Sequence, residues 1–262
     1  MGVVELRLRQ VALVAETLEP AVEDLCAVLG LEVCHRDPSV AQWGLGNAVM
    51  PLGGNFLEVV APAADGTSAA RYLKRRGGDG GYMVILQCAD AAAQRERITG
   101  LGPRPVWRAD RPAYTATHFH PGDTGGILLS VDSVEPGADF RAPLCSWEPA
   151  GPAWRGAVRT GIVRELAAVE LQSEDAGALA ALWSRILELP APAEADGRYA
   201  NALDNAALRF VPAADGRGAG LGAIDVAVAD RARLLAEAEH RGLEHSPDHV
   251  SVCGTRFNLG NA

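Results

Sequence analysis

Two histidines placed two positions apart are the first residues in this sequence whose spacing suggests chemistry. His118 and His120 belong to the segment THFHPGD. Residues two apart in a strand point to the same face of a sheet, and imidazole changes charge near neutral pH. If that face lines a cleft, the pair is suited to act as acid and base or to hold a metal. The alternative is that one histidine caps the turn after Pro121 and the other is solvated or buried.

A carboxylate inside an apolar strand is the second candidate. Glu58 lies in FLEVVAP, with apolar neighbours on both sides. A carboxylate in such a place needs a cation, a hydrogen-bond donor or a raised pKa. We predict that Glu58 is a metal ligand or a general base facing a cleft; the alternative is an edge-strand carboxylate paired with an arginine such as Arg71. Trp107 and Tyr114 precede the histidine strand and are predicted to line a pocket, although such aromatic residues often serve as core.

An internal duplication indicates how these residues are positioned. The five residues PAADG occur at Pro62–Gly66 and again at Pro212–Gly216, each time after a short apolar run. Longer stretches also align: Gln10–Val33 with Ala168–Pro192, and Gly81–Gly102 with Gly222–Gly242. Within the first half, LVAETLEPAVEDLCAVLG and LQCADAAAQRERITGLG share a strand, an acidic residue, a helical run and a Leu-Gly pair. We therefore interpret the chain as four related modules in two halves.

The periodicity of apolar residues predicts a βαβββ order in each module, and so an α+β fold of tandem paired modules. For the first module we expect a strand over Glu5–Ala15, a helix over Thr17–Leu29 and strands over Leu31–Arg36, Ala41–Val49 and Asn55–Ala61. For the second we expect a strand over Gly81–Cys88, a helix over Ala91–Thr99 capped by Asp90, and strands over Arg104–Arg108, Ala116–His120 and Gly126–Asp132. The second half repeats this scheme in shorter form.

The repeat divides the chain into two expected domains with a linker between them. Residues 1–133 form the domain with the expected site, and residues 161–262 form a second, divergent domain. Residues 134–160 are rich in Pro, Gly and Trp and have no periodicity, which is typical of a linker. Phe140, Trp147 and Trp154 predict that this linker packs against a domain.

Bulk properties exclude several classes of function. The chain has 262 residues, 48% hydrophobic, and a formal net charge of −9, with no basic stripe of the kind that binds nucleic acid. Its first residues do not resemble a signal peptide, and no apolar run is long enough for a membrane span. Five widely spaced cysteines without a C-x-x-C pair indicate reduced thiols. We expect a cytoplasmic protein whose partner is a small organic molecule, with no nucleic acid and no membrane.

In order and spacing, several segments resemble the vicinal oxygen chelate superfamily, which includes glyoxalase I, methylmalonyl-CoA epimerase, extradiol dioxygenases and bleomycin-resistance proteins. They are QVALVAETLEPAVEDLCAVLGLEV, NFLEVVAP, YLKRRGGDGGYMVIL and HPGDTGGILLSVD. The resemblance covers nearly the whole chain and is firmest over residues 5–133. It implies two glyoxalase-like domains, in each of which paired modules curl into a half-open barrel around a cleft.

The resemblance also implies where a metal would bind. Metal-dependent members of the superfamily hold a divalent ion with one side chain from the first and one from the last strand of each module. These positions fall on Gln10 and Glu58 in the first module, which are suitable oxygen donors, and on Met83 and Ser130 in the second, which are poor ligands for a hard ion. Met83 and Ser130 are therefore expected to shape the substrate pocket. The cofactor is predicted to be Mn, Fe, Ni or Zn, or none. In the second half, Ala168, Arg209, Ala223 and Asn258 retain no metal set.

Three functions follow from these residues and this resemblance. The first is an enzyme of the lyase or isomerase type, in which Glu58, His118 or His120 moves a proton next to a carbonyl group. The second is a non-catalytic small-molecule binding protein like the bleomycin-resistance proteins. The third is an extradiol-type dioxygenase, which ranks last because Met83 replaces the histidine that its iron site needs. The oligomeric state is left open, with a homodimer among the expectations.

Overall fold

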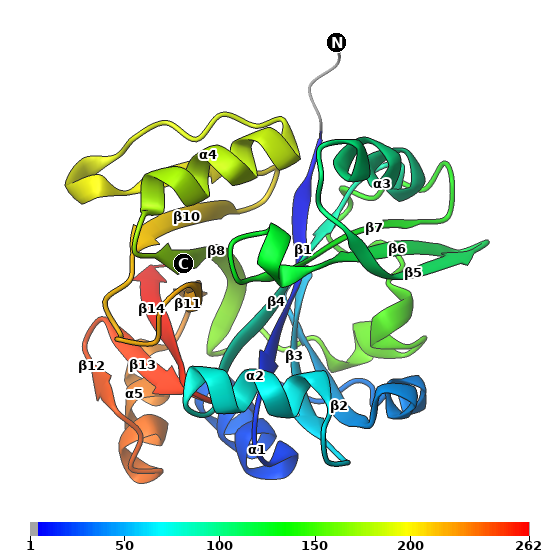
Figure 1. Ribbon diagram of the computed structural model, residues 1–262. Coiled ribbons are helices and arrows are strands. Elements are labelled where there is room, and N and C mark those ends of the chain that lie inside the picture. The colour runs from blue at the N-terminus through cyan, green and yellow to red at the C-terminus, as the bar shows by residue number, and fades with distance from the viewer. Residues whose placement is uncertain (1–4, 262) are drawn as a thin grey trace. The chain divides into compact units, whose positions relative to one another are not determined.

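The computed structural model, which describes residues 5–261, contains two mixed seven-stranded sheets with helices packed on them (Figure 1). In the first sheet the strands hydrogen-bond in the order β2-β3-β1-β4-β7-β6-β5, and in the second in the order β12-β13-β14-β11-β8-β10-β9. Each sheet therefore joins the strands of two modules. This is the arrangement expected for an α+β fold built from paired modules. The predicted fold class is confirmed.

The strands follow the predicted apolar runs closely. The first sheet contains β1 (Arg7–Val14), β2 (Leu45–Leu52), β3 (Asn55–Pro62), β4 (Gly80–Gln87), β5 (Pro105–Arg111), β6 (Tyr114–Phe119) and β7 (Leu128–Val134). The second contains β8 (Val163–Ser173), β9 (Tyr199–Ala202), β10 (Ala207–Pro212), β11 (Gly220–Val228), β12 (His245–Ser246), β13 (His249–Val252) and β14 (Thr255–Asn261).

Local sequence signals set the helix ends. The α-helices are α1 (Leu18–Leu29), α2 (Ser68–Arg76), α3 (Ala91–Gly100), α4 (Ala176–Leu187) and α5 (Arg231–His240). Asp90, Asp175 and Asp230 each accept a hydrogen bond from a backbone N–H in the first turn of α3, α4 and α5, which satisfies a donor that the helix leaves free. Gly30 ends α1 with φ of 69°, a left-handed conformation that glycine adopts without strain.

The prediction was wrong between α1 and β2. Leu31–Arg36 forms no strand, only an isolated bridge from His35 to Val49. Pro38–Trp43 forms a 3₁₀ helix because Asp37 caps it and Pro38 starts it. Its last three residues overlap the strand predicted over Ala41–Val49. Helix α2 lies between the predicted strands Asn55–Ala61 and Gly81–Cys88, in a stretch for which no helix bounds were predicted.

Contacts divide the chain into two compact units that cut across the sheets. Of the described residues, 5–10, 82–148 and 168–222 form unit 1, and 11–81, 149–167 and 223–261 form unit 2. The predicted domain boundaries at 133 and 161 follow the sheets rather than these units, and they remain a prediction.

In unit 1, helix α3 covers one face of β6 and β7. Ile98 on α3 is buried, and the Arg95 side chain donates to Thr117 Oγ1 on β6 at 2.7 Å. Since side chains alternate along a strand, the neighbours Ala116 and His118 point to the opposite face. On the other sheet of this unit, α4 packs against β9 and β10, with the rings of Trp183 and Phe210 6.1 Å apart.

In unit 2, helix α1 packs against β2, β3 and α5 through its buried apolar side. Strands β2 and β3 form a hairpin in which Val49 lies opposite Glu58.

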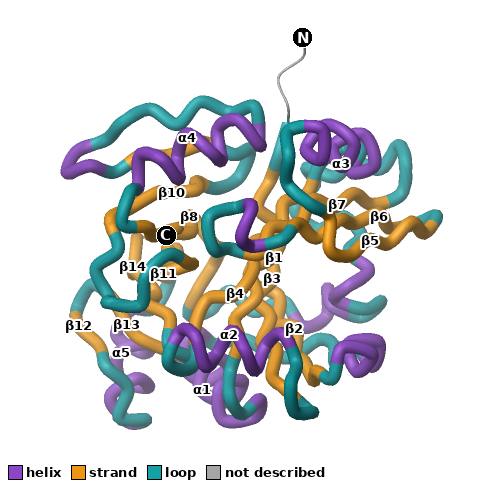
Figure 2. The backbone as a smooth tube through the Cα atoms, in the orientation of Figure 1, coloured by secondary structure: helices purple, strands orange, loops and turns teal. Residues whose placement is uncertain are grey.

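The segment between β7 and β8 is mostly loop with two short 3₁₀ helices, Glu148–Ala150 and Trp154–Ala157 (Figure 2). Phe140, Trp147 and Trp154 are all buried, so the prediction that the linker packs against folded structure is confirmed.

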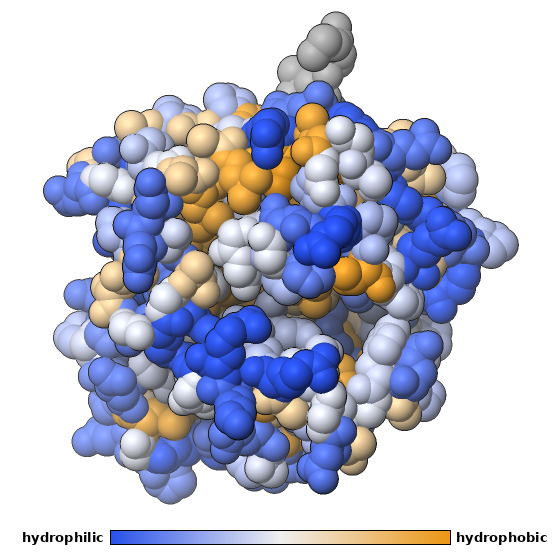
Figure 3. Space-filling model, viewed as in Figure 1, coloured by the Kyte–Doolittle hydropathy of each residue, from blue (hydrophilic) through white to orange (hydrophobic). Residues whose placement is uncertain are grey.

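The visible surface is largely hydrophilic, with some hydrophobic side chains gathered near α4 (Figure 3). Between residues 5 and 261, no helix has the length and apolar character needed to span a membrane.

Candidate functional site

Five of the residues predicted for the site share one sheet face in unit 1. Strand pairing places His118 opposite Ser130, Ala116 opposite Asp132, and Trp107 opposite His118. Tyr114 follows by alternation along β6, and β4 adds Met83 on the same side of the sheet. This is the face away from α3. Alternation within each strand and the register between neighbouring strands together bring these residues to one face.

A buried carboxyl group is the chemical centre of this face. Asp132 has no exposed surface, and it accepts hydrogen bonds from the Tyr114 hydroxyl at 2.5 Å and from the Ser130 hydroxyl. Burial raises the pKa of Asp132 to about 7, although both hydroxyl donors act to lower it. A carboxyl group that titrates near neutrality suits general acid–base chemistry. Sequence reasoning missed Asp132, although it lies in an apolar run, ILLSVDSV, just as Glu58 does.

Tyr114 is held so that it stays a hydrogen-bond donor. Burial, together with the adjacent Asp132, raises the pKa of the Tyr114 hydroxyl well above its usual value. The Arg111 guanidinium lies 5.2 Å from the centre of the Tyr114 ring and forms an ion pair with Glu148 at 2.9 Å. The Tyr114 phenol therefore remains protonated across the pH range in which Asp132 titrates.

His118 lies on the same face, but its protonation behaviour differs from the prediction. Its ring contacts Trp107, with the ring centres 4.4 Å apart. Burial lowers the pKa of His118 to about 3, so the imidazole is neutral near pH 7. In that state His118 can donate or accept one hydrogen bond, but it does not cycle between charge states. Its role as a site residue remains a prediction.

His120 lies outside β6, where it caps the turn that begins at Pro121. Its Nδ1 accepts from the Gly122 amide at 3.0 Å and lies 3.3 Å from an Arg104 nitrogen. Asp123 completes the turn through an ion pair with Arg104 at 2.8 Å. The structure therefore separates the two histidines, and His120 has the capping geometry that the sequence left as an alternative. The predicted catalytic role of His120 remains a prediction.

Part of the linker covers this face. We call residues 140–147 the strap. Trp147 donates its Nε1–H to Gln10 Oε1 at 2.7 Å, and its ring meets the Tyr114 ring edge-on at 5.7 Å. Cys145 lies near Gln87, with Sγ 3.7 Å from Nε2, and strand pairing places Gln87 beside Asp132. The linker therefore contributes directly to the site region, which no local pattern in the sequence revealed.

The unit 1 positions that the family resemblance assigns to metal ligands do not fit a hard divalent ion. Met83 supplies a thioether, the Ser130 hydroxyl donates to Asp132, and the Gln10 oxygen accepts from Trp147. Hard ions prefer carboxylate, carbonyl and water oxygens. Within residues 5–261, no group of three or more His, Cys, Asp and Glu side chains is arranged to hold a metal.

Glu58 belongs to unit 2. It is partly buried on β3, and its Oε1 accepts from Asn47 Nδ2 at 2.7 Å. The Asn47 oxygen in turn accepts from the Asp37 amide at 2.8 Å. On the same strand, Phe56 meets the buried ring of Trp154 edge-on at 4.9 Å. Glu58 is thus oriented by an amide, and its predicted role as base or ligand remains a prediction.

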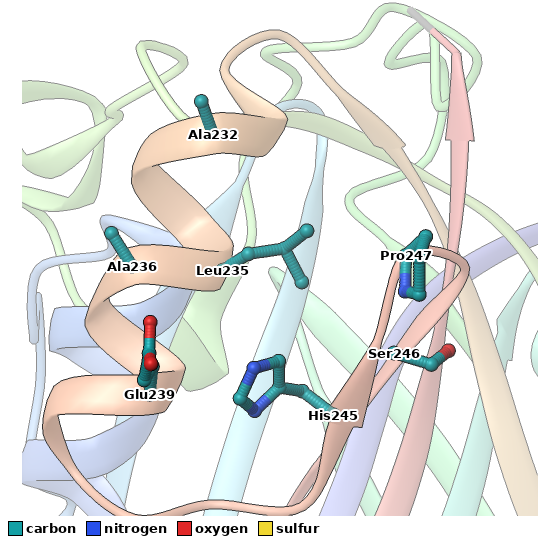
Figure 4. A pocket seen from close by; sticks show the side chains of 7 residues that line it. All are labelled: Ala232, Leu235, Ala236, Glu239, His245, Ser246 and Pro247. Carbon is teal, nitrogen blue, oxygen red and sulfur yellow. The ribbon is translucent and has the colours of Figure 1, made fainter.

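Unit 2 also has a surface hollow of about 460 Å³ between α5 and β12 (Figure 4). Leu235 from α5 and His245 from β12 point toward one another across it. The other lining residues are Ala232, Ala236, Glu239, Ser246 and Pro247. None of the residues predicted for the site lines this hollow.

Residues 11–187 match the family model described as the glyoxalase-like domain. The chain belongs to this glyoxalase-like family, within the vicinal oxygen chelate superfamily. The resemblance predicted from the sequence is confirmed. Among the curated proteins, none has a sequence significantly similar to this glyoxalase-like protein.

Solved structures share the fold of this glyoxalase-like protein. A mutant 4-hydroxymandelate synthase from Streptomyces coelicolor is 16% identical with a TM-score of 0.67, and the match covers 93% of this chain and 76% of that one. A hypothetical protein from Staphylococcus aureus is 10% identical with a TM-score of 0.66, covering 98% and 99% of the two chains. Methylmalonyl-CoA epimerase from Streptomyces coelicolor, in complex with 2-nitronate-propionyl-CoA, is 21% identical over 50% of this chain and 98% of its own, with a TM-score of 0.45. At these identities the first two matches establish the fold and nothing about the reaction.

Proposed function

We propose that this glyoxalase-like protein is a small-molecule enzyme of the lyase or isomerase type that moves a proton on the carbon next to a carbonyl group. The observation that carries the proposal is the buried carboxyl group of Asp132, whose pKa is raised to about 7 and which two hydroxyl groups hold in place. Proton transfer from carbon is fastest when the pKa of the base lies near the working pH.

The proposed step uses groups from one sheet face. The ionised Asp132 carboxylate takes a proton from the carbon next to the carbonyl, so a C–H bond breaks and an O–H bond forms on Asp132. The electron pair moves onto the carbonyl oxygen as an enolate. The neutral imidazole of His118 is suited to donate a hydrogen bond to that oxygen. Return of the proton to carbon completes an isomerisation, and loss of a group from the adjacent carbon completes an elimination.

Access to Asp132 requires local movement. Asp132 is fully buried, and Trp147 of the strap lies against its partner Tyr114. Substrate therefore reaches the carboxyl group when the strap moves away from the face. Movement of a covering segment is a common step in enzyme cycles and excludes water when the segment closes again.

Proton exchange tests the proposal without knowledge of the natural substrate. Small 2-oxo acids, thioesters and hydroxyketones are incubated with the protein in D₂O, and loss of the C–H signal is followed by NMR. We expect enzyme-dependent exchange with at least one class, reduced roughly 10²-fold or more in Asp132→Asn. Asp110→Asn, which alters an exposed carboxylate on β5, is the matched control. Equal exchange rates in wild type and Asp132→Asn would contradict the assignment.

The residues predicted from the sequence are tested in the same assay. Glu58→Gln and His120→Gln keep approximate size while removing the ionisable group. A loss of exchange in Glu58→Gln would support the base predicted at that position. Stoichiometric Mn, Fe, Ni or Zn in the purified protein, lost in Glu58→Ala, would support a metal site that includes Glu58.

A non-catalytic binding protein is the second candidate. It is favoured because the polar groups of this face already have hydrogen-bond partners. Asp132 accepts from the Tyr114 and Ser130 hydroxyl groups, and Gln10 accepts from Trp147 of the strap. Ligand binding without C–H exchange in any substrate class would support this function. An extradiol-type dioxygenase ranks third, because Met83 and Ser130 stand where iron ligands would be needed.

A further inference from the structure

Two buried arginines next to the site have no role in the proton transfer described above. Arg7 and Arg9 lie on β1 in unit 1 and are 3% and 0% exposed. Arg7 Nη1 donates to the carbonyl oxygens of Phe140, Arg141 and Ala142, at 3.1, 2.9 and 3.1 Å. Arg9 donates from Nη1 to the Pro143 oxygen at 3.2 Å and from Nη2 to the Cys145 oxygen at 2.9 Å. The two guanidinium groups therefore hold the backbone of the strap.

The acceptors in these contacts are neutral backbone carbonyl oxygens. Three carbonyl oxygens converge on one nitrogen of Arg7, which carries two hydrogens, so they share its hydrogen bonds. A guanidinium fork matches carboxylate and phosphate groups, which bind it in a bidentate way. Hydrogen bonds in which both partners are charged are stronger than those to a neutral acceptor. An anion of the right size is therefore a better partner for these arginines than the carbonyl groups of the strap.

Trp147 links these arginines to the carboxyl group of the site. The Arg9 guanidinium lies 5.3 Å from the centre of the Trp147 ring, and the Trp147 and Tyr114 rings meet nearly at right angles with their centres 5.7 Å apart. Tyr114 in turn donates to Asp132. Movement of the strap would uncover the arginines and the Tyr114–Asp132 pair together.

We propose that Arg7 and Arg9 form an anion subsite occupied in this structure by the strap, and that a carboxylate- or phosphate-bearing small molecule binds there by displacing the strap. The strap thereby acts as an internal competitor for the ligand. This proposal rests on the proposed function in one respect, because it names the class of substrate that would bind to the Asp132 face. Binding itself requires no proton transfer, so the two ideas can be tested separately.

Equilibrium binding and cysteine labelling provide the test. Pyruvate and inorganic phosphate are the anionic probes, and methyl pyruvate is the neutral control. Binding is measured by calorimetry, and opening of the strap by the rate at which iodoacetamide alkylates Cys145, read by mass spectrometry of its peptide. We expect at least one anion to bind and to accelerate Cys145 labelling several-fold, with no effect of methyl pyruvate. The anion that binds more tightly identifies carboxylate or phosphate as the preferred group.

Three variants sharpen the result. Arg9→Gln should weaken anion binding at least tenfold, while Arg108→Gln, at an exposed arginine on β5, should leave it unchanged. Trp147→Phe removes the hydrogen bond from the strap to Gln10 and should tighten anion binding roughly two- to tenfold, the value of one hydrogen bond. This last variant keeps the test valid if Arg9→Gln fails to fold, because a residue with only a structural role would not improve affinity.

Specific outcomes overturn the proposal. The first is that neither anion binds. The second is that an anion binds but the rate of Cys145 alkylation stays unchanged. The third is that Trp147→Phe binds the anion no more tightly than the wild type does. Anion binding and strap opening without C–H exchange would keep this inference and reject the proposed function. C–H exchange with neutral carbonyl compounds but no anion binding would do the reverse.

Discussion

Asp132 in unit 1 and Glu58 in unit 2 are carboxylates in similar sequence contexts with different surroundings. Each lies in the final strand of its module among apolar residues. Asp132 is fully buried and held by two hydroxyl donors, whereas Glu58 is partly buried and oriented by the amide of Asn47. An acidic residue in an apolar run is therefore a candidate functional residue, and its burial and hydrogen-bond donors in the fold decide its chemistry.

Each unit buries one tryptophan of the linker segment. Trp147 covers the Asp132 face of unit 1 and donates to Gln10, whereas Trp154 packs on Phe56 of β3 in unit 2. Both indole rings are almost completely buried.

The largest expected effect comes from removing a linker tryptophan. Trp147→Ala should lower the free energy of unfolding by about 3–5 kcal/mol, as for other buried aromatic side chains. Trp154→Ala should cost about the same from packing alone. Urea denaturation of both variants measures the effect. A cost below about 1 kcal/mol for Trp147→Ala would show that the strap is not firmly seated in solution.

The pH dependence of stability tests the buried carboxyl group. Because folding raises the pKa of Asp132 from 3.8 to about 7, its contribution is fully present below pH 4 and is lost as the pH rises through 7. The total amounts to roughly 4 kcal/mol. The lowered pKa of His118 acts in the opposite direction, since its contribution is present above pH 6.5 and is lost as the pH falls toward 3.

Single variants should separate these opposed contributions. In Asp132→Asn only the His118 contribution remains, so the stability should rise with pH up to about 6.5. In His118→Asn only the Asp132 contribution remains, so the stability should fall between pH 4 and 7. Denaturation midpoints across this pH range provide the measurement. Asp110→Asn is the control, because Arg95 lowers the pKa of Asp110 and the removed contribution has the opposite sign to that of Asp132. Parallel pH profiles for wild type and Asp132→Asn would refute the raised pKa.

Loss of one hydroxyl donor should have an intermediate effect. Tyr114→Phe removes the hydrogen bond to Asp132, so the pKa of Asp132 should rise further. At pH 8, where the carboxyl group of the wild type is mostly ionised, stability should therefore fall by up to about 3 kcal/mol. Carbon-detected NMR titration of the carboxyl groups measures the pKa. An unchanged Asp132 titration would indicate that the hydroxyl does not reach the carboxyl group in solution.

The smallest expected effect is at Glu58. Asn47→Ala removes the amide that orients Glu58 and the acceptor of the Asp37 amide, and should cost about 1 kcal/mol. Chemical denaturation provides the value. A cost above that of Tyr114→Phe would reverse the comparison between the two carboxylates.

Much of the fold follows from local patterns. Apolar runs predicted β1 and β3, and Asp90 was identified as a helix cap from sequence. Side-chain alternation within the paired strands explains why His118, Tyr114, Trp107, Ser130 and Met83 share a face. The segment from Leu31 to Gly44 was mispredicted because its apolar residues suggested strands, whereas Asp37, Pro38 and Gly44 set a short 3₁₀ helix.

What the sequence could not predict depends on contacts between distant residues. Trp147 was expected to pack somewhere, but its hydrogen bond to Gln10 joins residues 137 positions apart. Arg7 and Arg9 have no local pattern that points to the strap carbonyls. The pKa values of Asp132 and His118 likewise depend on burial by neighbouring strands, so sequence alone predicted His118 as an ordinary neutral-pH base.

The opposed titrations of Asp132 and His118 also have a calorimetric consequence. Near pH 5.5, unfolding releases a proton from Asp132 while the His118 imidazole takes one up. Between them, the two groups exchange no net proton with the solvent. The heat that this pair adds to thermal melting should therefore be the same in buffers with very different ionisation enthalpies, such as acetate and imidazole-type buffers. Replacing either residue would make that heat depend on the buffer.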